Sequence, residues 1–252
     1  MSALLSLRGV ALRVGGLEIL SCVDLDLQAG ETLGLIGPNG AGKTTLFNII
    51  NGMARPSAGQ VLLDGADLRA RSPIQRARLG LVRSFQTSRI FPELNMLQNL
   101  TLAVRLKKGC AYRWWGRGAA RRDSEAAALA LLEHSTLAGR GHIPARSLSY
   151  GEQRILDLLI ALAQQPRVLL LDEPTAGLSE SESREVMALV HAMRGQCAVL
   201  LISHDIDIVF QECDRIAVLS SGSLLTTGTP AQVRRHAGVR QAYLGELALE
   251  TA

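Results

Sequence analysis

The chain has 252 residues, of which 47% are hydrophobic and 20% are charged, so it can form one large globular domain or a core with a subdomain. Its net charge of +4 permits a phosphate ligand, an anionic membrane surface or nucleic acid as a partner and selects none of them. The four cysteines form no C-x-x-C pair, and no apolar run approaches the roughly 18 residues of a membrane span, which argues against a metal or disulfide framework and against a transmembrane protein.

The first part of the chain has the pattern of short strands separated by turns. The opening M-S-A-L-L-S-L-R is too short an apolar stretch for a signal peptide, so we expect a chain that stays in the cytosol. Short apolar strands are expected in residues 4–27, broken at Gly15 and Gly16, and E-T-L-G-L-I-G predicts a buried strand that leads to a helix over residues 44–51. Further strands are expected at residues 59–65 and 81–85.

Helical periodicity dominates residues 95–146, in N-M-L-Q-N-L-T-L-A-V and in S-E-A-A-A-L-A-L-L-E-H. After Gly151, helices and strands alternate, which implies a parallel α/β sheet with the helical segment inserted as a subdomain. The expected elements are a helix over residues 152–164, a strand over 168–171, a helix over 180–193 and a strand over 198–202.

G-P-N-G-A-G-K-T-T matches the phosphate-loop pattern G-x-x-x-x-G-K-[ST] between a predicted strand and a predicted helix. Glycines let the backbone wrap closely, so its N–H groups and the helix N-terminus face the phosphates. Lys43 is expected to reach the β- and γ-phosphates and the Thr44 hydroxyl to ligate Mg²⁺. The alternative is a chance glycine-rich turn with a surface lysine. The predicted nucleotide-binding residues are Gly37, Pro38, Asn39, Gly40, Ala41, Gly42, Lys43, Thr44 and Thr45.

An acidic pair follows a buried strand in R-V-L-L-L-D-E-P. Asp172 is expected to hold Mg²⁺ through water, as the second acidic element of phosphate-loop NTPases does. Strand side chains alternate in direction, so Glu173 points differently and is a candidate to activate the attacking water. The alternative is that both carboxylates are turn residues ahead of Pro174.

L-S-Y-G-E-Q-R, which starts at Leu148, precedes an apolar helical run and allows two interpretations. Ser149, with Glu152 three residues later, fits a capping box that satisfies backbone N–H groups at a helix start. Alternatively, the exposed helix N-terminus serves as a phosphate site.

These residues together resemble an ATP-binding cassette (ABC) ATPase over nearly the whole chain. Each motif alone is weak, whereas six in the family's order at cassette-like spacing are specific. The motifs are the phosphate loop, the glutamine of R-S-F-Q-T (Gln86), L-S-Y-G-E-Q, the acidic pair, A-G-L-S (residues 176–179) and the histidine of L-I-S-H-D (His204).

The resemblance implies an α/β P-loop NTPase fold of the RecA-like type. Such a fold has a parallel sheet core, an N-terminal antiparallel β-subdomain and an inserted α-helical subdomain. We therefore predict a single cassette over residues 1–252. The core with its β-subdomain would take residues 1–94 and 155–252, and the helical subdomain with the signature motif residues 95–154.

The family resemblance also implies a head-to-tail pair of cassettes that enclose two ATP molecules. Gln86 would sense the Mg²⁺ and the attacking water and link to a membrane subunit, and His204 would contact the γ-phosphate. A-G-L-S would cross the dimer interface, while Ser149 and Gly151 would reach the ATP held by the opposite cassette. The predicted catalytic residues are thus Glu173, His204 and Gln86, and the predicted metal ligands are Thr44, Gln86 and Asp172.

The implied partners are a second ATPase subunit, in a heterodimer or a homodimer, and transmembrane permease subunits. A periplasmic solute-binding protein would act indirectly, and no nucleic acid is expected. The chain would lie peripherally at the cytoplasmic face of the inner membrane.

Within that superfamily the chain looks like the ATPase subunits of branched-chain amino acid importers. Tyr150 stands where most cassettes have glycine, and both the segment after Gln86 and the C-terminal V-R-Q-A-Y-L-G-E resemble that group. Importers of urea or short amides use a similar cassette, and a lipopolysaccharide-transport ATPase shares the Y-L-G-E ending. A non-transport cassette would usually show paired cassettes or a long coiled coil, and a P-loop kinase would not explain L-S-Y-G-E or His204.

Two positions depart from the family pattern. Val14 stands where cassettes usually stack adenine on an aromatic residue, so adenine binding is expected to be weaker by roughly 1 kcal/mol. Glu152 replaces the more usual glutamine, and a carboxylate aimed at a triphosphate would be repulsive. We therefore expect Glu152 to turn back to the Ser149 N–H and serve the helix cap.

Residues 105–122 hold seven basic residues, no acidic one and both tryptophans. They allow three interpretations: a solvated loop of the helical subdomain, a contact with a membrane surface through Trp114 and Trp115, or nucleic-acid binding.

Overall fold

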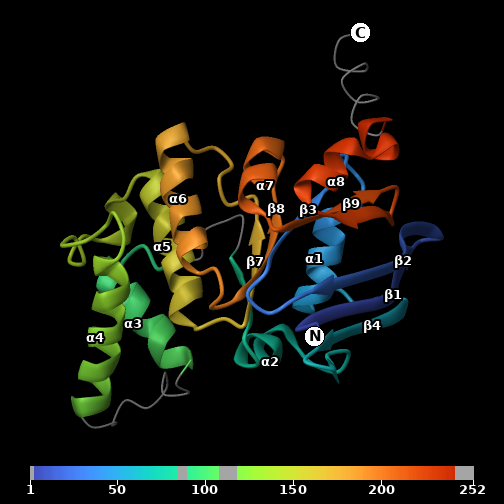
Figure 1. Ribbon diagram of the computed structural model, residues 1–252. Coiled ribbons are helices and arrows are strands. Elements are labelled where there is room, and N and C mark those ends of the chain that lie inside the picture. Colours follow the sequence, from blue (N-terminus) through green and yellow to red (C-terminus); the bar gives the residue numbers. More distant parts are fainter. Residues whose placement is uncertain (1–2, 85–89, 108–117, 242–252) are drawn as a thin grey trace. The chain divides into compact units, whose positions relative to one another are not determined.

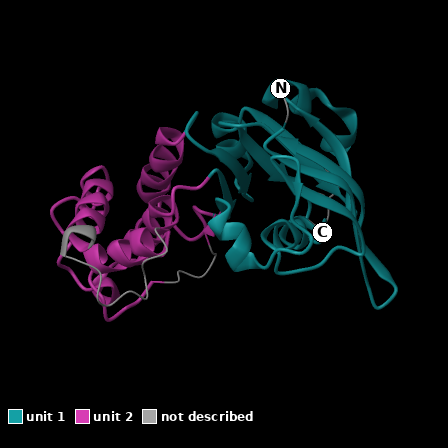
Figure 2. Ribbon diagram, turned by 90° about the horizontal axis from the view of Figure 1, so that it is seen from below, with its two compact units in different colours: residues 1–81, 167–173, 194–252 teal, residues 82–166, 174–193 magenta. Residues whose placement is uncertain are grey.

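The computed structural model describes residues 3–84, 90–107 and 118–241 (Figure 1). Two compact units make up the chain (Figure 2). Unit 1 comprises residues 1–81, 167–173 and 194–252, and unit 2 comprises residues 82–166 and 174–193. The predicted helical subdomain, residues 95–154, lies within unit 2, which also takes up residues 82–94, 155–166 and 174–193.

Unit 1 contains an antiparallel sheet and a mainly parallel sheet. The antiparallel sheet has the order β2-β1-β4-β5, formed by β1 (Leu5–Val14), β2 (Leu17–Leu27), β4 (Ala58–Leu63) and β5 (Ala66–Asp67). Sequence reasoning predicted short strands at its start, whereas β1 and β2 are long. Their pairing shifts register near Val10 and Leu12, and these bulges hide the regular alternation that a long strand shows.

The second sheet carries the predicted parallel core. Its strands in unit 1 are β3 (Thr32–Ile36), β7 (Val168–Asp172), β8 (Ala198–Ile202), β9 (Arg215–Ser220) and β10 (Ser223–Gly228). They are ordered β10-β9-β3-β8-β7, with β9, β3, β8 and β7 parallel and β10 antiparallel. Every residue of β3, β7 and β8 is buried, as expected of a parallel sheet covered on both faces. Strand β6 (Leu81–Ser84) leads from unit 1 into unit 2.

Unit 1 contains the helices α1 (Lys43–Asn51), α2 (Pro73–Arg78), α7 (Ile206–Glu212) and α8 (Pro230–Arg235), and residues 237–241 are helical as well. Helix α1 buries Leu46, Phe47, Ile49 and Ile50 in one apolar cluster with residues of both sheets. Because α1 follows directly on β3 and the phosphate-loop turn, this burial fixes where the turn lies (Figure 1).

Unit 2 is helical. It contains α3 (Met96–Lys107), α4 (Gly118–Glu133), a short 3-10 turn η1 (Ala145–Ser147), α5 (Tyr150–Ala163) and α6 (Glu180–Ala192). Helix α3 packs against α4 and α5, and α5 packs against α6. Helix α5 begins two residues before the predicted start because Ser149 is its N-cap. None of the helices in the described segments is long and apolar enough to cross a bilayer.

Arg76 joins α2 to the C-terminal end of α1. Its side chain is buried, with Nη1 donating to the Ile49 and Ile50 carbonyls at 2.7 and 2.6 Å and Nη2 donating to the Leu68 carbonyl at 2.8 Å. A cation there is favourable because the last carbonyls of a helix carry partial negative charge and lack intrahelical donors. Burial lowers the pKa of Arg76, and the charge of Asp67 opposes that shift.

Removal of the Arg76 guanidinium is therefore expected to destabilise unit 1. The Arg76→Met substitution keeps the apolar stem but takes the guanidinium donor from the buried Ile50 carbonyl, whereas the Ile49 and Leu68 carbonyls keep the Gly52 and Arg71 N–H groups. We therefore expect the free energy of unfolding to fall by about 1–3 kcal/mol. Urea denaturation measures this change. Arg78→Met, an exposed position of the same helix, is the matched control and should change stability by less than about 0.5 kcal/mol. Equal effects of both substitutions would contradict the capping role.

Candidate functional site

The phosphate loop closes around the Lys43 ammonium. Lys43 Nζ donates to the Gly37 carbonyl at 2.5 Å and to the Pro38 carbonyl at 2.9 Å. Two positions of the loop require glycine. A Cβ at Gly37 would overlap the Leu219 carbonyl oxygen, and Gly42, with φ +100°, would place one 2.7 Å from Leu20 Cδ2. The loop conformation is thus accessible to this sequence only because glycine stands at both places.

Helix α1 begins at Lys43 with Gly42 as its N-cap, and no side chain caps it. The first N–H groups of a helix have no intrahelical acceptor and carry partial positive charge. The loop and the helix start therefore present backbone donors to an anion without competition from a capping side chain. Thr44 is exposed at this end, within reach of the same ligand.

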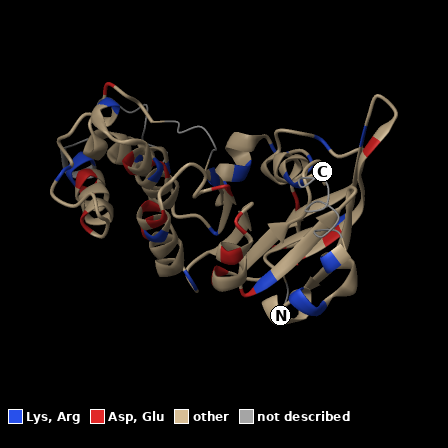
Figure 3. Ribbon diagram, turned by 90° about the horizontal axis from the view of Figure 1, so that it is seen from above, with Lys and Arg blue, Asp and Glu red and all other residues tan. Residues whose placement is uncertain are grey.

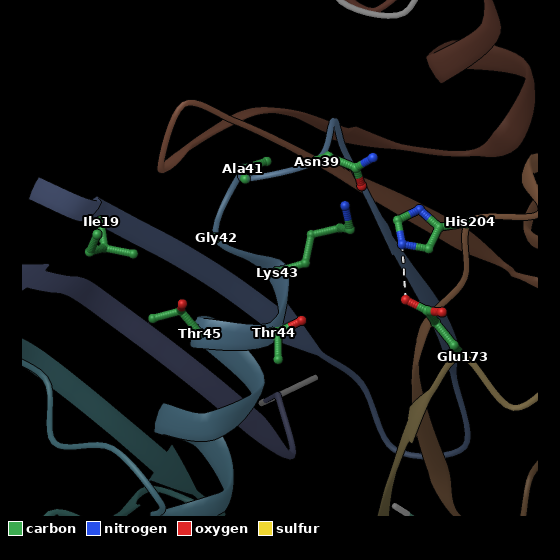
Figure 4. A pocket seen from close by; sticks show the side chains of 10 residues that line it. Ile19, Asn39, Ala41, Gly42, Lys43, Thr44, Thr45, Glu173 and His204 are labelled. Atoms are coloured by element: carbon green, nitrogen blue, oxygen red, sulfur yellow. Dashed lines mark ion pairs between the residues drawn. The ribbon is translucent and has the colours of Figure 1, made fainter. Parts of the chain in front are cut away.

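A cavity of about 200 Å³ lies over this turn (Figure 4). All its lining residues belong to unit 1: Ile19, Asn39, Gly40, Ala41, Gly42, Lys43, Thr44, Thr45, Glu173 and His204. In Figure 4, Glu173 and His204 lie to one side of the Lys43 side chain and Ile19 to the other. Most of the predicted nucleotide-binding residues and two predicted catalytic residues thus share one cavity.

Glu173 and His204 come from different strand ends and form a pair. Glu173 Oε1 accepts from His204 Nε2 at 2.9 Å. Residues Asp172 and Ile202 are register partners in parallel strands, so the residues that follow them emerge at the same edge of the sheet. The Glu173 N–H donates to the Ile202 carbonyl at 2.9 Å, which holds the start of the turn.

Glu173 has φ +50°, a left-handed conformation that costs a non-glycine residue on the order of 1–3 kcal/mol. Such strain persists where the surrounding structure over-determines it and is concentrated at functional sites. Asp172, the preceding residue, is buried at the end of β7. Of the two successive carboxylates, Glu173 therefore lines the cavity, and Asp172 is buried at the end of its strand.

Sequence reasoning missed Ile19. It considered Val14 for this part of the site, but Val14 is 59% exposed and does not line the cavity. Ile19 lies beside the loop because Gly222 links strand β2 to the loop by hydrogen bonds. The Ser21 N–H donates to the Gly222 carbonyl, and the Gly222 N–H donates to the Ala41 carbonyl. No local pattern links these three segments, so the sequence carried no signal for Ile19.

The signature residues lie in unit 2. Ser149 is the N-cap of α5, where its Oγ accepts from the Glu152 N–H at 3.2 Å and its own N–H donates to Glu152 Oε2 at 2.8 Å. The expected capping box is therefore present. Arg140 donates to the other carboxylate oxygen, Oε1. Gly151 is buried in the first turn. Gln86 lies outside the described residues, as does most of the basic segment 105–122.

Comparison with known proteins identifies the family. Residues 20–176 match the ABC transporter family, and residues 223–248 match the branched-chain amino acid ATP-binding cassette transporter family. The chain belongs to the ABC transporter family. It is an ATP-binding and ATP-hydrolysing subunit, so the resemblance seen in the motifs and the predicted P-loop NTPase fold are confirmed.

The similarity extends over nearly full length. The chain is 40% identical over 250 residues to LivG of Escherichia coli (strain K12), a high-affinity branched-chain amino acid transport ATP-binding protein, covering 96% of this chain and 98% of LivG. It is 36% identical to BraF of Pseudomonas aeruginosa, with the same coverage. Among solved structures, MJ1267, an ATP-binding cassette of an ABC transporter, superposes with a TM-score of 0.84 at 25% identity and covers 96% of this chain and 99% of MJ1267.

The Glu152 cap makes a prediction for stability. Glu152→Ala removes the acceptor of the Ser149 N–H and should lower the free energy of unfolding by about 1–2 kcal/mol. Glu152→Gln keeps an acceptor for that N–H but loses the charge that faces Arg140, so its cost should be smaller. If Glu152→Ala changed ATP affinity and left stability untouched, the carboxylate would act on nucleotide instead.

The pair of Glu152 and Arg140 predicts how the stability of the fold depends on pH. The Arg140 hydrogen bond holds the pKa of Glu152 below its usual value of 4.5, against the opposing effect of burial. A carboxyl group with a lowered pKa in the folded state stabilises the fold above the unfolded-state pKa. This contribution is lost as the pH falls through the folded-state pKa. The stability difference between wild type and Glu152→Gln should therefore be full near pH 7 and shrink below about pH 4.

Proposed function

We propose that this chain is the ATP-hydrolysing subunit of an importer for branched-chain amino acids or a related small polar solute. The observation that carries the solute class is the match of residues 223–248 to the branched-chain cassette family, together with 40% identity to LivG over nearly the full length. The observation that carries hydrolysis is the cavity in which the phosphate loop faces Glu173 and His204.

The roles of the residues follow from that cavity. The loop N–H groups and Lys43 bind the phosphates. Glu173 orients the attacking water and accepts its proton, while His204 donates to the γ-phosphate from the same edge of the sheet. Gln86 completes the set from the segment after β6. These roles make the strained backbone at Glu173 part of the positioning of its carboxylate.

Mg²⁺ fits the oxygen atoms at hand. Thr44 lines the cavity and is exposed, and Asp172 ends strand β7, directly before the cavity residue Glu173. Within the described segments, no group of three or more His, Cys, Asp or Glu side chains forms a metal cage. A ligand set of the Thr44 hydroxyl and the Asp172 carboxylate suits Mg²⁺, which prefers one or two protein oxygens plus substrate phosphates. Bound there, Mg²⁺ would neutralise phosphate charge, with Gln86 as a third predicted contact.

The partners follow from the family. We propose a head-to-tail dimer, with a different cassette or with a second copy, in which Ser149 and Gly151 act on the partner's nucleotide. A cassette named MJ0796 with a TM-score of 0.75 to this chain is dimeric in a post-hydrolysis state bound to ADP and phosphate. Permease subunits would hold the dimer at the cytoplasmic face of the membrane, and a periplasmic binding protein would act through them.

That nucleic acid is not a partner stays a prediction, and the described residues carry charges of both signs. Basic and acidic residues are interspersed over the described part of both units (Figure 3). Many basic side chains of the described residues form ion pairs with carboxylates. The pairs include Arg8–Asp26, Arg13–Glu18, Arg121–Glu125, Arg146–Glu93 and Arg167–Asp64.

Uptake tests the solute class. The chain should co-purify with a polytopic permease, and the purified complex in proteoliposomes should hydrolyse ATP and take up labelled leucine when the binding protein of the same gene cluster is supplied. Urea and short amides are the competing solutes. Co-purification with a lipopolysaccharide export complex, or with no membrane protein, would contradict the proposal.

Glu173→Gln tests the hydrolytic mechanism. The amide cannot accept the proton of the attacking water, so turnover should fall by about 100-fold or more while ATP binding is retained. ATPase assays and equilibrium binding of a fluorescent ATP analogue measure the two effects. Glu18→Gln makes the same chemical change at an exposed position of unit 1 and should leave turnover unaffected. Undiminished hydrolysis in Glu173→Gln would remove this residue from the mechanism.

Val14 tests how the base is held. An aromatic ring there would supply the stacking face that the sequence lacks, so Val14→Tyr should tighten ATP binding by about fivefold and increase the preference for ATP over GTP. Arg13→Tyr is the control, because side chains alternate along β1 and the ring would lie on the opposite face. Equal affinity of Val14→Tyr and wild type would show that another group, with Ile19 the nearest candidate, holds the base.

A further inference from the structure

Tyr150, whose role the sequence did not reveal, contacts the A-G-L-S segment within unit 2. Its hydroxyl donates to the Ala176 carbonyl at 3.3 Å. Its ring lies against Gly177, where a Cβ would stand 3.3 Å from Tyr150 Cε1. Gly177 has φ +75°, so glycine is favoured there by backbone conformation as well as by the ring.

A second contact runs in the opposite direction, from the first turn of α6, which directly follows A-G-L-S, to the signature segment. A Cβ at Gly151 would overlap the carboxylate oxygen Oε1 of Glu182. That carboxylate is fixed, because its other oxygen, Oε2, accepts from the Ser179 N–H at 2.9 Å and from Ser179 Oγ at 2.7 Å in the cap of α6. Gly151 therefore accommodates a side chain that cannot move away without breaking this cap.

The two contacts are reciprocal. Each segment contributes a glycine, and each contributes a side chain that fills the space over the other segment's glycine. We call these four residues, Tyr150, Gly151, Gly177 and Glu182, the glycine interlock. Arg154, one turn further along α5, lies over the Tyr150 ring at 5.5 Å from its centroid and restricts the ring's orientation.

Burial in a core does not account for Tyr150, because its side chain is 51% exposed. A half-exposed aromatic ring that is held by a hydrogen bond, a cation and a glycine contact is well placed to keep a surface in one shape. The surface in question comprises the start of α5 and the A-G-L-S turn, which are the two parts of unit 2 expected to face a second cassette.

We propose that Tyr150 is a positioning residue that joins the signature segment to the A-G-L-S segment, so that both meet the second cassette as one preformed surface. The inference rests on the proposed function, in which Ser149 and Gly151 act on the partner's ATP. A surface that is already ordered loses less conformational entropy on association. The interlock therefore favours ATP-dependent dimerisation and leaves ATP binding at the chain's own site unaltered.

Variants at Tyr150 separate the two contributions of the side chain. Tyr150→Ala removes the ring and the hydroxyl, whereas Tyr150→Phe removes the hydroxyl alone. Leu129→Ala removes a comparable exposed apolar side chain from α4 of the same unit and is the matched control. Each variant is made in the Glu173→Gln background, which holds ATP, and sedimentation equilibrium gives the dimer dissociation constant alone and with the cassette that co-purifies with the chain.

The expected result is a rise in the dimer dissociation constant of about tenfold for Tyr150→Ala and about threefold for Tyr150→Phe, since packing is retained in the latter. Leu129→Ala should dimerise as wild type does. The dissociation constant of ATP from the isolated chain should stay within about twofold in all variants. Equal dimerisation of Tyr150→Ala and wild type would overturn the inference while leaving the proposed function intact. By contrast, failure of the Glu173→Gln parent to dimerise with ATP would overturn the proposed function itself.

A double-mutant cycle tests the interlock independently of dimerisation. Gly177→Ala carries backbone strain in any background, but its contact with the ring exists only when Tyr150 is present. The loss of stability caused by Gly177→Ala should therefore be smaller in Tyr150→Ala than in wild type, measured by urea denaturation. Additive losses would show that the ring does not constrain Gly177 and would overturn the proposal.

Discussion

The structure of the site depends on the bond between the Lys43 ammonium and the carbonyls of Gly37 and Pro38. A loop that binds phosphate must point its N–H groups inward, and this leaves carbonyls that need a donor. The lysine supplies one from within the loop. The rest of unit 1 then holds the loop from outside. The loop follows β3, and α1, which follows the loop, buries its apolar side chains in the core. Arg76 donates to the carbonyls at the C-terminal end of α1.

The catalytic carboxylate is placed by the sheet. Parallel pairing of β7 with β8 brings Asp172 level with Ile202, so that Glu173 and His204 emerge at one edge and meet at 2.9 Å. The positive φ at Glu173 shows that its direction is set by the turn rather than by local preference. Strain of this kind is tolerable because the apolar strands on either side are buried throughout and supply the opposing stability.

Much of the fold and of the site could be predicted because the signals are local. The phosphate loop, the acidic pair after β7 and the Ser149–Glu152 capping box each occupy a few consecutive residues, and the structure has each in the expected element. Ile19 and Arg76 could not be predicted, since their roles arise from contacts between segments far apart in the chain. The long strands β1 and β2 were missed for a different reason, because bulges break the alternation on which a strand prediction depends.

Helix capping and phosphate recognition at α5 are compatible because they use different amides. The capping box occupies the N–H groups of Ser149 and Glu152. The N–H groups of Tyr150 and Gly151 lie between them and have no intrahelical acceptor, as in the first turn of any helix. With its carboxylate bonded to Ser149 and to Arg140, Glu152 does not place a free negative charge in front of them. The carboxylate that departs from the family's usual glutamine thus strengthens the helix start and leaves those two amides to an anion.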